Sequence, residues 1–123
     1  MFEVSKMIRF EAAHQLPNHD GKCARLHGHS FIAEIVVRRA HVHASGPKEG
    51  MAIDFGDIKA ASEDLVENYL DHHHLNETTG LFAPTSEQLA KWIFERLEPS
   101  LAGLHSVSVH ETCTSKATYT RPV

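Results

Sequence analysis

Two segments of alternating apolar residues, separated by a short loop, constrain this chain more than any other feature of its sequence. The apolar side chains keep even numbers in the first segment and odd numbers in the second: Phe2, Val4, Ile8, Phe10 and Ala12, then Phe31, Ala33, Ile35 and Val37. Alternate residues of a β-strand point to the same side, so the pattern predicts strands over residues 2–15 and 29–39, each with one buried face. Proline and glycine residues between the two segments predict a loop.

Three histidines continue the two apolar faces at the ends of these strands. His14 keeps the even parity of the first segment, and His29 and His27 keep the odd parity of the second when it is extended backwards. If the strands are neighbours in one sheet, their ends bring the three rings together at the rim of the core. Neutral imidazole is the commonest metal ligand in proteins, so the pattern predicts a metal site.

The composition of this ligand set indicates a catalytic metal. Structural zinc is usually closed by four protein ligands and is rich in cysteine, whereas catalytic zinc keeps one position open. Here the nearest thiol, Cys23, lies in a glycine-containing, turn-like stretch before His27. We therefore expect three histidine ligands and a water. The alternative is that these histidines are ordinary polar loop residues in a chain that contains 11 of them.

The apolar period changes after residue 57, where the spacing becomes helical. One helical face is formed by Ile58, Ala61, Leu65, Val66, Tyr69 and Leu70. Thr85 and Gln88 have the spacing of a capping box, so they predict the start of a second helix, which Pro99 ends. Alternation returns after Gly103 and predicts a strand through residues 107–113 and a short strand over 116–119. This order predicts an α+β fold, with an antiparallel sheet and helices on one face.

Length and charge exclude several classes of protein. A chain of 123 residues can bury one core but not two, which predicts a single domain over residues 1–123. The net charge of -4, without a basic stripe, argues against nucleic acid as the main partner. Cys23 and Cys113 lie far apart in the sequence, which points to a reducing compartment rather than to a disulfide. Residues 1–10 contain charged side chains, so this segment resembles neither a signal peptide nor a membrane span. We expect a cytoplasmic protein without a membrane partner.

Glu111 interrupts the apolar face of the strand that follows Gly103. Burying a carboxylate is costly unless it meets a charged or multiply hydrogen-bonding partner. A ligand with an amidine-like edge, such as a 2-aminopyrimidinone ring, would offer two parallel hydrogen bonds. The alternative is a salt bridge from Glu111 to a lysine or arginine.

Asp71 and His72 follow the first predicted helix. An aspartate beside a histidine can orient the imidazole and stabilise its charged form. With Cys23 as a third member, the set has the composition of a thiol-based acid/base relay, although sequence alone does not bring the three together. His73 and His74 are interpreted as solvated residues at the helix end.

Five short motifs occur in order along nearly the whole chain: FEAAH at 10–14, CARLHGH at 23–29, LDH at 70–72 with LN at 75–76, PTSE at 84–87 and ET at 111–112. Together they resemble the 6-pyruvoyl-tetrahydropterin synthase superfamily. The resemblance is strongest to its bacterial branch, whose members form 6-carboxy-5,6,7,8-tetrahydropterin in queuosine biosynthesis. The feature that favours this branch is the three-residue gap between Cys23 and His27, since animal-type members usually have a longer one.

The resemblance implies a tunnelling fold, in which a four-stranded antiparallel sheet carries two helices on one face. Subunits of such proteins associate through their sheets into trimeric barrels, and two barrels stack into a homohexamer. Active sites then lie between subunits, so that Cys23 serves a pocket containing Asp71 and His72 of a neighbour.

The resemblance also implies a reaction and its residues. The substrate is 7,8-dihydroneopterin triphosphate, and the products are 6-carboxytetrahydropterin, acetaldehyde and triphosphate. The zinc ion, Zn2+, is held by His14, His27 and His29, while Cys23 accepts a proton and His72, oriented by Asp71, moves protons. Glu111, catalytic in this scheme, also binds the pterin ring, and Thr85 belongs to the substrate-binding set.

Three points stay open from the sequence. Lys22, Arg25 and Lys116 are candidates for the triphosphate site, which no motif assigns. A sister activity would use the same metal and base but stop at a 6-pyruvoyl product, without cleaving the side chain. A more distant alternative is a zinc-binding protein without catalytic activity, which would leave Glu111 unexplained.

Overall fold

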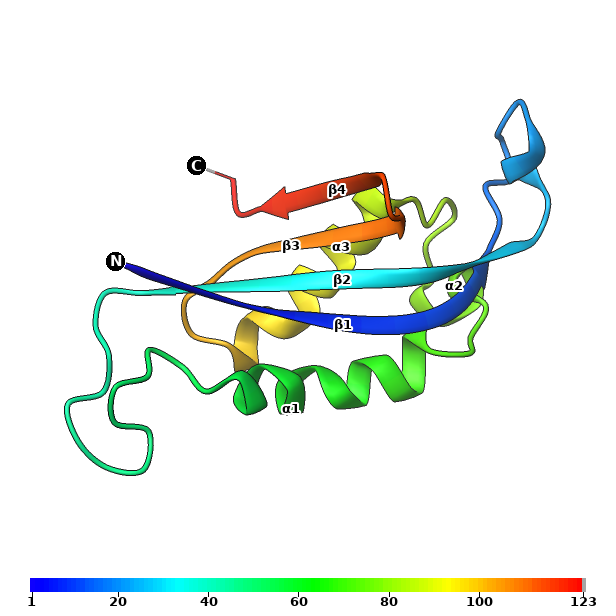
Figure 1. The fold of residues 1–123 in the computed structure, drawn as a ribbon. Helices are drawn as coiled ribbons and strands as arrows, with labels where there is room; N and C mark the ends of the chain where they lie inside the picture. Colours follow the sequence, from blue (N-terminus) through cyan, green and yellow to red (C-terminus); the bar gives the residue numbers. More distant parts are fainter. Residues whose placement is uncertain (123) are drawn as a thin grey trace.

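The computed structural model describes residues 1–122 and contains one antiparallel sheet with helices on one of its faces (Figure 1). The strands lie in the order β1-β2-β3-β4: β1 is Phe2–His14, β2 is His27–Arg39, β3 is Leu104–Thr112 and β4 is Ser115–Thr120. The two main helices are α1, Phe55–Leu65, and α3, Ser86–Leu97, and a short helix α2 spans Leu75–Thr79. The predicted α+β fold, with four antiparallel strands and two helices on one face, is confirmed.

The register between β1 and β2 follows the parity of the sequence. Phe10 is opposite Phe31, and their rings stack with centroids 5.1 Å apart. Toward the end of the hairpin, Ala12 is opposite His29 and His14 is opposite His27. The second strand begins two residues earlier than the sequence predicted, at His27, because Gly28 takes part in the ladder instead of breaking it.

The core lies between the sheet and the helices. From the sheet it receives the alternate apolar side chains of the three longer strands, and α3 contributes Leu89, Ala90, Ile93, Phe94 and Leu97, all nearly inaccessible to solvent. α3 packs against β3 and β4, whereas α1 packs against β1. Each large apolar side chain buried in this way contributes about 1.5–3 kcal/mol to folding.

Local interactions fix the ends of the helices. Asp54 caps α1 by accepting a hydrogen bond from the backbone N–H of Gly56, and Thr85 caps α3 by accepting one from Gln88. Both caps satisfy N–H groups that a helix start leaves free. The first helix was expected to continue to residue 70 in regular form, but Val66–Leu70 forms a π-helical turn. This turn releases the chain at Asp71, whose N–H donates to the carbonyl of Val66.

The remaining segments connect these elements. A loop with a 3-10 turn, Lys22–Ala24, joins β1 to β2, and another 3-10 turn, Glu98–Ser100, follows α3. Figure 1 shows that the first loop projects from the end of the sheet near α2. Within residues 1–122, no helix combines the length and apolar character needed to cross a membrane.

Candidate metal centre and active site

The three predicted metal ligands come together at the end of the β1–β2 hairpin. Each of His14, His27 and His29 offers one ring nitrogen, and these nitrogens lie within 4.8 Å of one another. The ring centroids are 4.6 to 5.2 Å apart. His14 is completely buried, while the other two rings are half-buried. Three imidazoles at this spacing could hold one metal ion.

Backbone carbonyls set the orientation of two of these rings. Nδ1 of His14 donates to the carbonyl of Pro84 over 2.8 Å, and Nδ1 of His27 donates to the carbonyl of Arg25 over 2.7 Å. Because a carbonyl only accepts, each Nδ1 carries the proton, and in the neutral ring Nε2 carries a lone pair. Histidines that bind metals usually have such a partner on the second nitrogen.

The unpaired nitrogens also fit a cation. Among residues 1–122, the buried Nε2 atoms of His14 and His29 have no hydrogen-bond partner. Burial is the main influence on the pKa of His14 and lowers it, and it outweighs the bond to Pro84 and the charge of Glu111, which raise it. A ring kept neutral by desolvation retains the lone pair that a metal requires.

Glu111 faces this cluster from β3. Its Oε1 lies 3.3 Å from Nε2 of His14 and 3.7 Å from Nε2 of His29, and the carboxylate makes no hydrogen bond to either ring. The side chain is 31% exposed, so it is partly buried, as its position on the apolar face suggested. Within residues 1–122, its ionic neighbours are these histidines and not a lysine or arginine.

Asp71 and His72 form a hydrogen-bonded pair beside the edge of β1. Oδ2 of Asp71 accepts a 2.8 Å hydrogen bond from Nδ1 of His72, and Oδ1 accepts another from the N–H of Glu11. The bond from Glu11 is the largest of the influences that lower the pKa of Asp71, and the bond from His72 adds to it. The ring of His72 is 80% exposed, so a neighbouring molecule can reach it.

The backbone of His72 is held in an unusual conformation. Its φ is 59°, in the left-handed region that residues with side chains rarely adopt. The N–H of His72 donates to the carbonyl of Glu11, and the N–H of Ala13 donates to the carbonyl of His73. These bonds compensate for the strain, and residues held in this way are frequent at functional sites.

Cys23 lies in the 3-10 turn of the β1–β2 loop and is half-buried. Its carbonyl accepts a hydrogen bond from Leu16, which fixes the backbone of the loop. Within residues 1–122, no hydrogen bond joins the thiol to Asp71 or His72. A single chain therefore brings the histidine cluster together with Glu111, but it does not connect Cys23 to the Asp71–His72 pair.

Some contacts of the site had no signal in the sequence. Asn76 bridges 61 residues by accepting from the N–H of Gln15 and donating to its carbonyl, which ties α2 to the end of β1. The carbonyl of Pro84 was equally unexpected as a partner of His14, and it brings the neighbouring Thr85 close to the metal centre. Backbone acceptors carry no side-chain pattern, so alternation and motif spacing do not reveal them.

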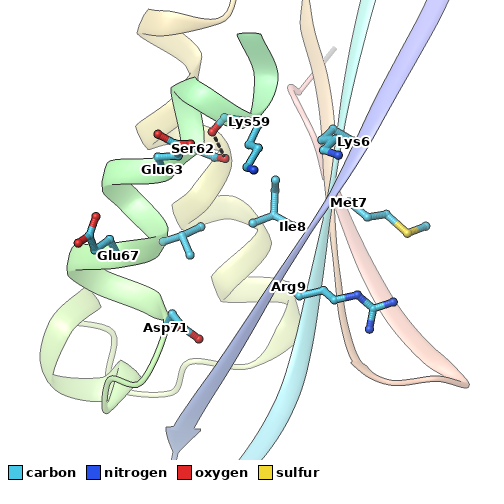
Figure 2. Close-up of a pocket in the computed structure, with 10 residues that line it drawn as sticks. Lys6, Met7, Ile8, Arg9, Lys59, Ser62, Glu63, Glu67 and Asp71 are labelled. Atoms are coloured by element: carbon cyan, nitrogen blue, oxygen red, sulfur yellow. Dashed lines mark hydrogen bonds between the residues drawn. The ribbon is translucent and has the colours of Figure 1, made fainter. Parts of the chain in front are cut away.

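Two hollows adjoin this region. One, of about 400 Å³, is lined by His29 and His72 with Glu11 and Ser30, whose hydroxyl donates to the carboxylate of Glu11. A larger one, of about 510 Å³, lies between β1 and α1, and Figure 2 shows Ile8 and Lys59 projecting into it. The larger hollow contains none of the three clustered histidines. We place the candidate site at the metal centre because the chemistry of the side chains converges there.

Comparison with known proteins decides the family. The family model described as 6-pyruvoyl tetrahydropterin synthase matches residues 3–122. The chain belongs to this family. Within the 6-pyruvoyl tetrahydropterin synthase family, the chain is 51% identical to the 6-carboxy-5,6,7,8-tetrahydropterin synthase of Synechocystis sp., covering 99% of this chain and 95% of that protein. The enzyme of the same name from Haemophilus influenzae is 31% identical, with 97% and 99% covered.

Solved structures of 6-pyruvoyl tetrahydropterin synthases share the architecture. The Caenorhabditis elegans enzyme superposes with a TM-score of 0.82 at 25% identity, covering 98% of this chain and 96% of that one. The Plasmodium falciparum enzyme, at 19% identity, gives a TM-score of 0.72 over 99% and 98% of the two chains, which supports the fold alone. The family resemblance and the tunnelling fold expected from the motifs are therefore confirmed.

Proposed function

We propose that this protein is a zinc-dependent lyase that converts 7,8-dihydroneopterin triphosphate into 6-carboxy-5,6,7,8-tetrahydropterin, acetaldehyde and triphosphate, a step toward queuosine and related 7-deazaguanines. The observation that carries the proposal is the 51% identity, over 99% of the chain, to a protein named for this product. The histidine cluster supplies a site for the metal that such a reaction requires.

His14, His27 and His29 would hold the zinc ion, because three neutral imidazoles at the rim of a core form the usual ligand set of a catalytic zinc site. When bound there, zinc supplies Lewis-acid polarisation to the side-chain oxygens of the substrate. The carbonyls of Pro84 and Arg25 keep two rings in the orientation for binding, so the site is preorganised by the protein.

Proton transfer falls to Cys23 and His72 in this proposal. Cys23 would remove a proton from the substrate side chain, and His72 would deliver and accept protons during loss of triphosphate and carbon–carbon cleavage. Asp71 fixes the tautomer of His72 by accepting from Nδ1, which leaves Nε2 for exchange with the substrate. The exposed ring of His72 suits a role at a surface shared with another subunit.

Ring recognition falls to Glu111 and Thr85. A carboxylate can accept two parallel hydrogen bonds from the 2-aminopyrimidinone edge of a pterin, which gives both affinity and orientation. Thr85 follows Pro84, the partner of His14, and therefore lies beside the metal centre. Lys22, Arg25 and Lys116 remain candidates for binding the triphosphate, since all three are exposed cations.

We further propose a homohexamer of two stacked trimeric barrels in the cytoplasm, with active sites between subunits. Two features support an assembly of this kind. Cys23 is not connected to Asp71 and His72 within one chain, and β1 and β4 are edge strands that leave backbone groups available for another sheet. Neither nucleic acid nor membrane is a partner in this proposal.

The direct test is to incubate the zinc-loaded protein with 7,8-dihydroneopterin triphosphate and identify the products by mass spectrometry. Acetaldehyde together with 6-carboxytetrahydropterin supports the proposal. Cys23→Ala should abolish both, whereas the matched variant of the exposed cysteine, Cys113→Ala, should retain them. A folded, zinc-loaded protein that leaves the substrate intact would refute the assignment.

The sister reaction is the second candidate, and the similarity to the Caenorhabditis elegans 6-pyruvoyl tetrahydropterin synthase favours keeping it in view. It predicts a 6-pyruvoyl product and no acetaldehyde. The same experiment separates the two, because only side-chain cleavage releases the two-carbon fragment.

A further inference from the structure

The contact between Glu111 and the histidine cluster brings several lone pairs to one point. Nε2 of His14 faces Oε1 of Glu111 at 3.3 Å, and the proton of the neutral His14 ring is on Nδ1, bonded to Pro84. Nε2 of His29 is 3.7 Å from the same oxygen. Neither Nε2 has a hydrogen-bond partner among residues 1–122, so two ring nitrogens and one carboxylate oxygen converge on the same point, as the ligands of a single cation do. Zinc is most often four-coordinate, with nitrogen and oxygen ligands of these types.

We infer that Glu111 is the fourth ligand of the metal in the substrate-free protein, and that binding of a pterin ring draws this carboxylate away and opens the metal to the substrate. The second half of this inference rests on the proposed function, because it takes a pterin as the ligand. The first half concerns the metal alone.

One carboxylate does not serve the ring and the metal at the same time. A carboxylate that accepts two hydrogen bonds from the 2-aminopyrimidinone edge has both oxygens engaged. That edge and the side chain lie at opposite ends of a pterin, so a side chain at the metal places the edge a full bicyclic ring away. Glu111 must therefore leave the histidines in order to hold the ring.

The local structure allows such a movement. The pairing of β3 with β4 shifts register between His110 and Thr112, so that Glu111 lies at a bulge without a cross-strand partner. Bulges redirect side chains and are common beside active sites. The side chain of Glu111 is also 31% exposed and lies one residue before the end of β3. It can rotate about three side-chain bonds.

The consequence for the enzyme is a fixed order of binding, in which the pterin ring is recognised before the substrate side chain reaches the metal. With Glu111 on the metal, water and stray anions compete with an intramolecular ligand for the fourth position. Only a molecule that offers the correct ring edge removes that ligand, so recognition of the ring precedes activation of the side chain.

The test uses the cobalt-substituted full-length protein, because the visible spectrum of Co2+ reports the number and type of its ligands. We compare the wild type with Glu111→Gln and Glu111→Ala, and with Glu77→Gln, an exposed carboxylate that lies 3.3 Å from His74 and away from the metal centre. The inference predicts that both Glu111 variants have altered spectra and bind the metal about tenfold or more weakly, as measured by chelator competition. Glu77→Gln should match the wild type in both measurements. Circular dichroism establishes that each variant is folded.

The second arm adds unsubstituted pterin, which has the ring edge but no side-chain oxygens. Its binding, measured by calorimetry, should shift the wild-type spectrum toward that of Glu111→Ala and leave the spectrum of the variant unchanged.

Identical spectra and metal affinities in the wild type and the Glu111 variants would overturn the ligand role. Pterin that binds without changing the wild-type spectrum would overturn the displacement. Pterin that does not bind at all would overturn the displacement together with the proposed substrate class, while the metal arm still decides the ligand role.

Discussion

Phe31 packs against two rings of the candidate metal centre, and its replacement by leucine should lower both the stability of the fold and the affinity for zinc. The ring is fully buried, stacks on Phe10 at 5.1 Å and meets the rings of His14 and His29 edge-on, with both centroids 5.4 Å away. An aromatic pair contributes about 0.5–1.5 kcal/mol beyond its buried area. With a small residual cavity, Phe31→Leu should reduce the free energy of unfolding by about 1–2 kcal/mol.

The same change removes the surface against which two ligand rings rest. We expect zinc affinity, measured against a chromophoric chelator, to fall about tenfold, because supporting groups around a metal site commonly contribute on this scale. Phe94→Leu is the matched control, since Phe94 is equally buried but packs on Tyr119, away from the histidines. Urea unfolding of the metal-free proteins should give similar losses for both variants. Equal zinc affinities in the two variants would refute the idea that Phe31 positions the ligands.

Three further results are expected. Asp71→Asn should lower the free energy of unfolding at neutral pH and slow turnover. Because the folded pKa of Asp71 is lowered, its stabilisation is present above about pH 4 and is lost as the pH falls through that lowered pKa. Urea unfolding of the variant and the wild type should therefore converge in strong acid. Thr85→Ala should lower the free energy of unfolding by about 1 kcal/mol, because it removes the cap of α3, and Thr85→Ser should retain the wild-type stability. Equal thermal unfolding of all three proteins would contradict a stabilising role for this cap. Zinc at 100 times its Kd should stabilise the protein by about 2.7 kcal/mol, an effect that EDTA abolishes and that is lost in His27→Ala.

The strand pair and the histidine cluster could be predicted because the period of a strand is two. A shift of one residue would expose a whole face, so the parity of Phe10 and Phe31 fixes the register, and His14, His27 and His29 follow from it. The cap of α3 was also visible, since Thr85 acts on Gln88, a neighbour only three residues away.

Contacts between distant segments could not be predicted in the same way. Glu11 and Asp71 are 60 residues apart, and their hydrogen bond depends on where the π-helical turn releases the chain. The helical pattern through residue 70 does not distinguish that turn from a regular helix, because a single π-helical turn at the end of a helix is too short to change the apolar period. Likewise, the sequence placed Glu111 on the apolar face of its strand, but it did not indicate that this residue meets the histidines of the β1–β2 hairpin.

The hydrogen bond from His14 to Pro84 has a consequence for the order of folding. The β1–β2 hairpin contains all three histidines, so a chain with only this hairpin formed already has the ligands. The partner that orients His14 comes 70 residues later, at the start of α3, and arrives only when that helix docks on the sheet. Tight metal binding should therefore require the docking of α3, and the rate at which zinc is captured should follow that docking rather than the pairing of the strands.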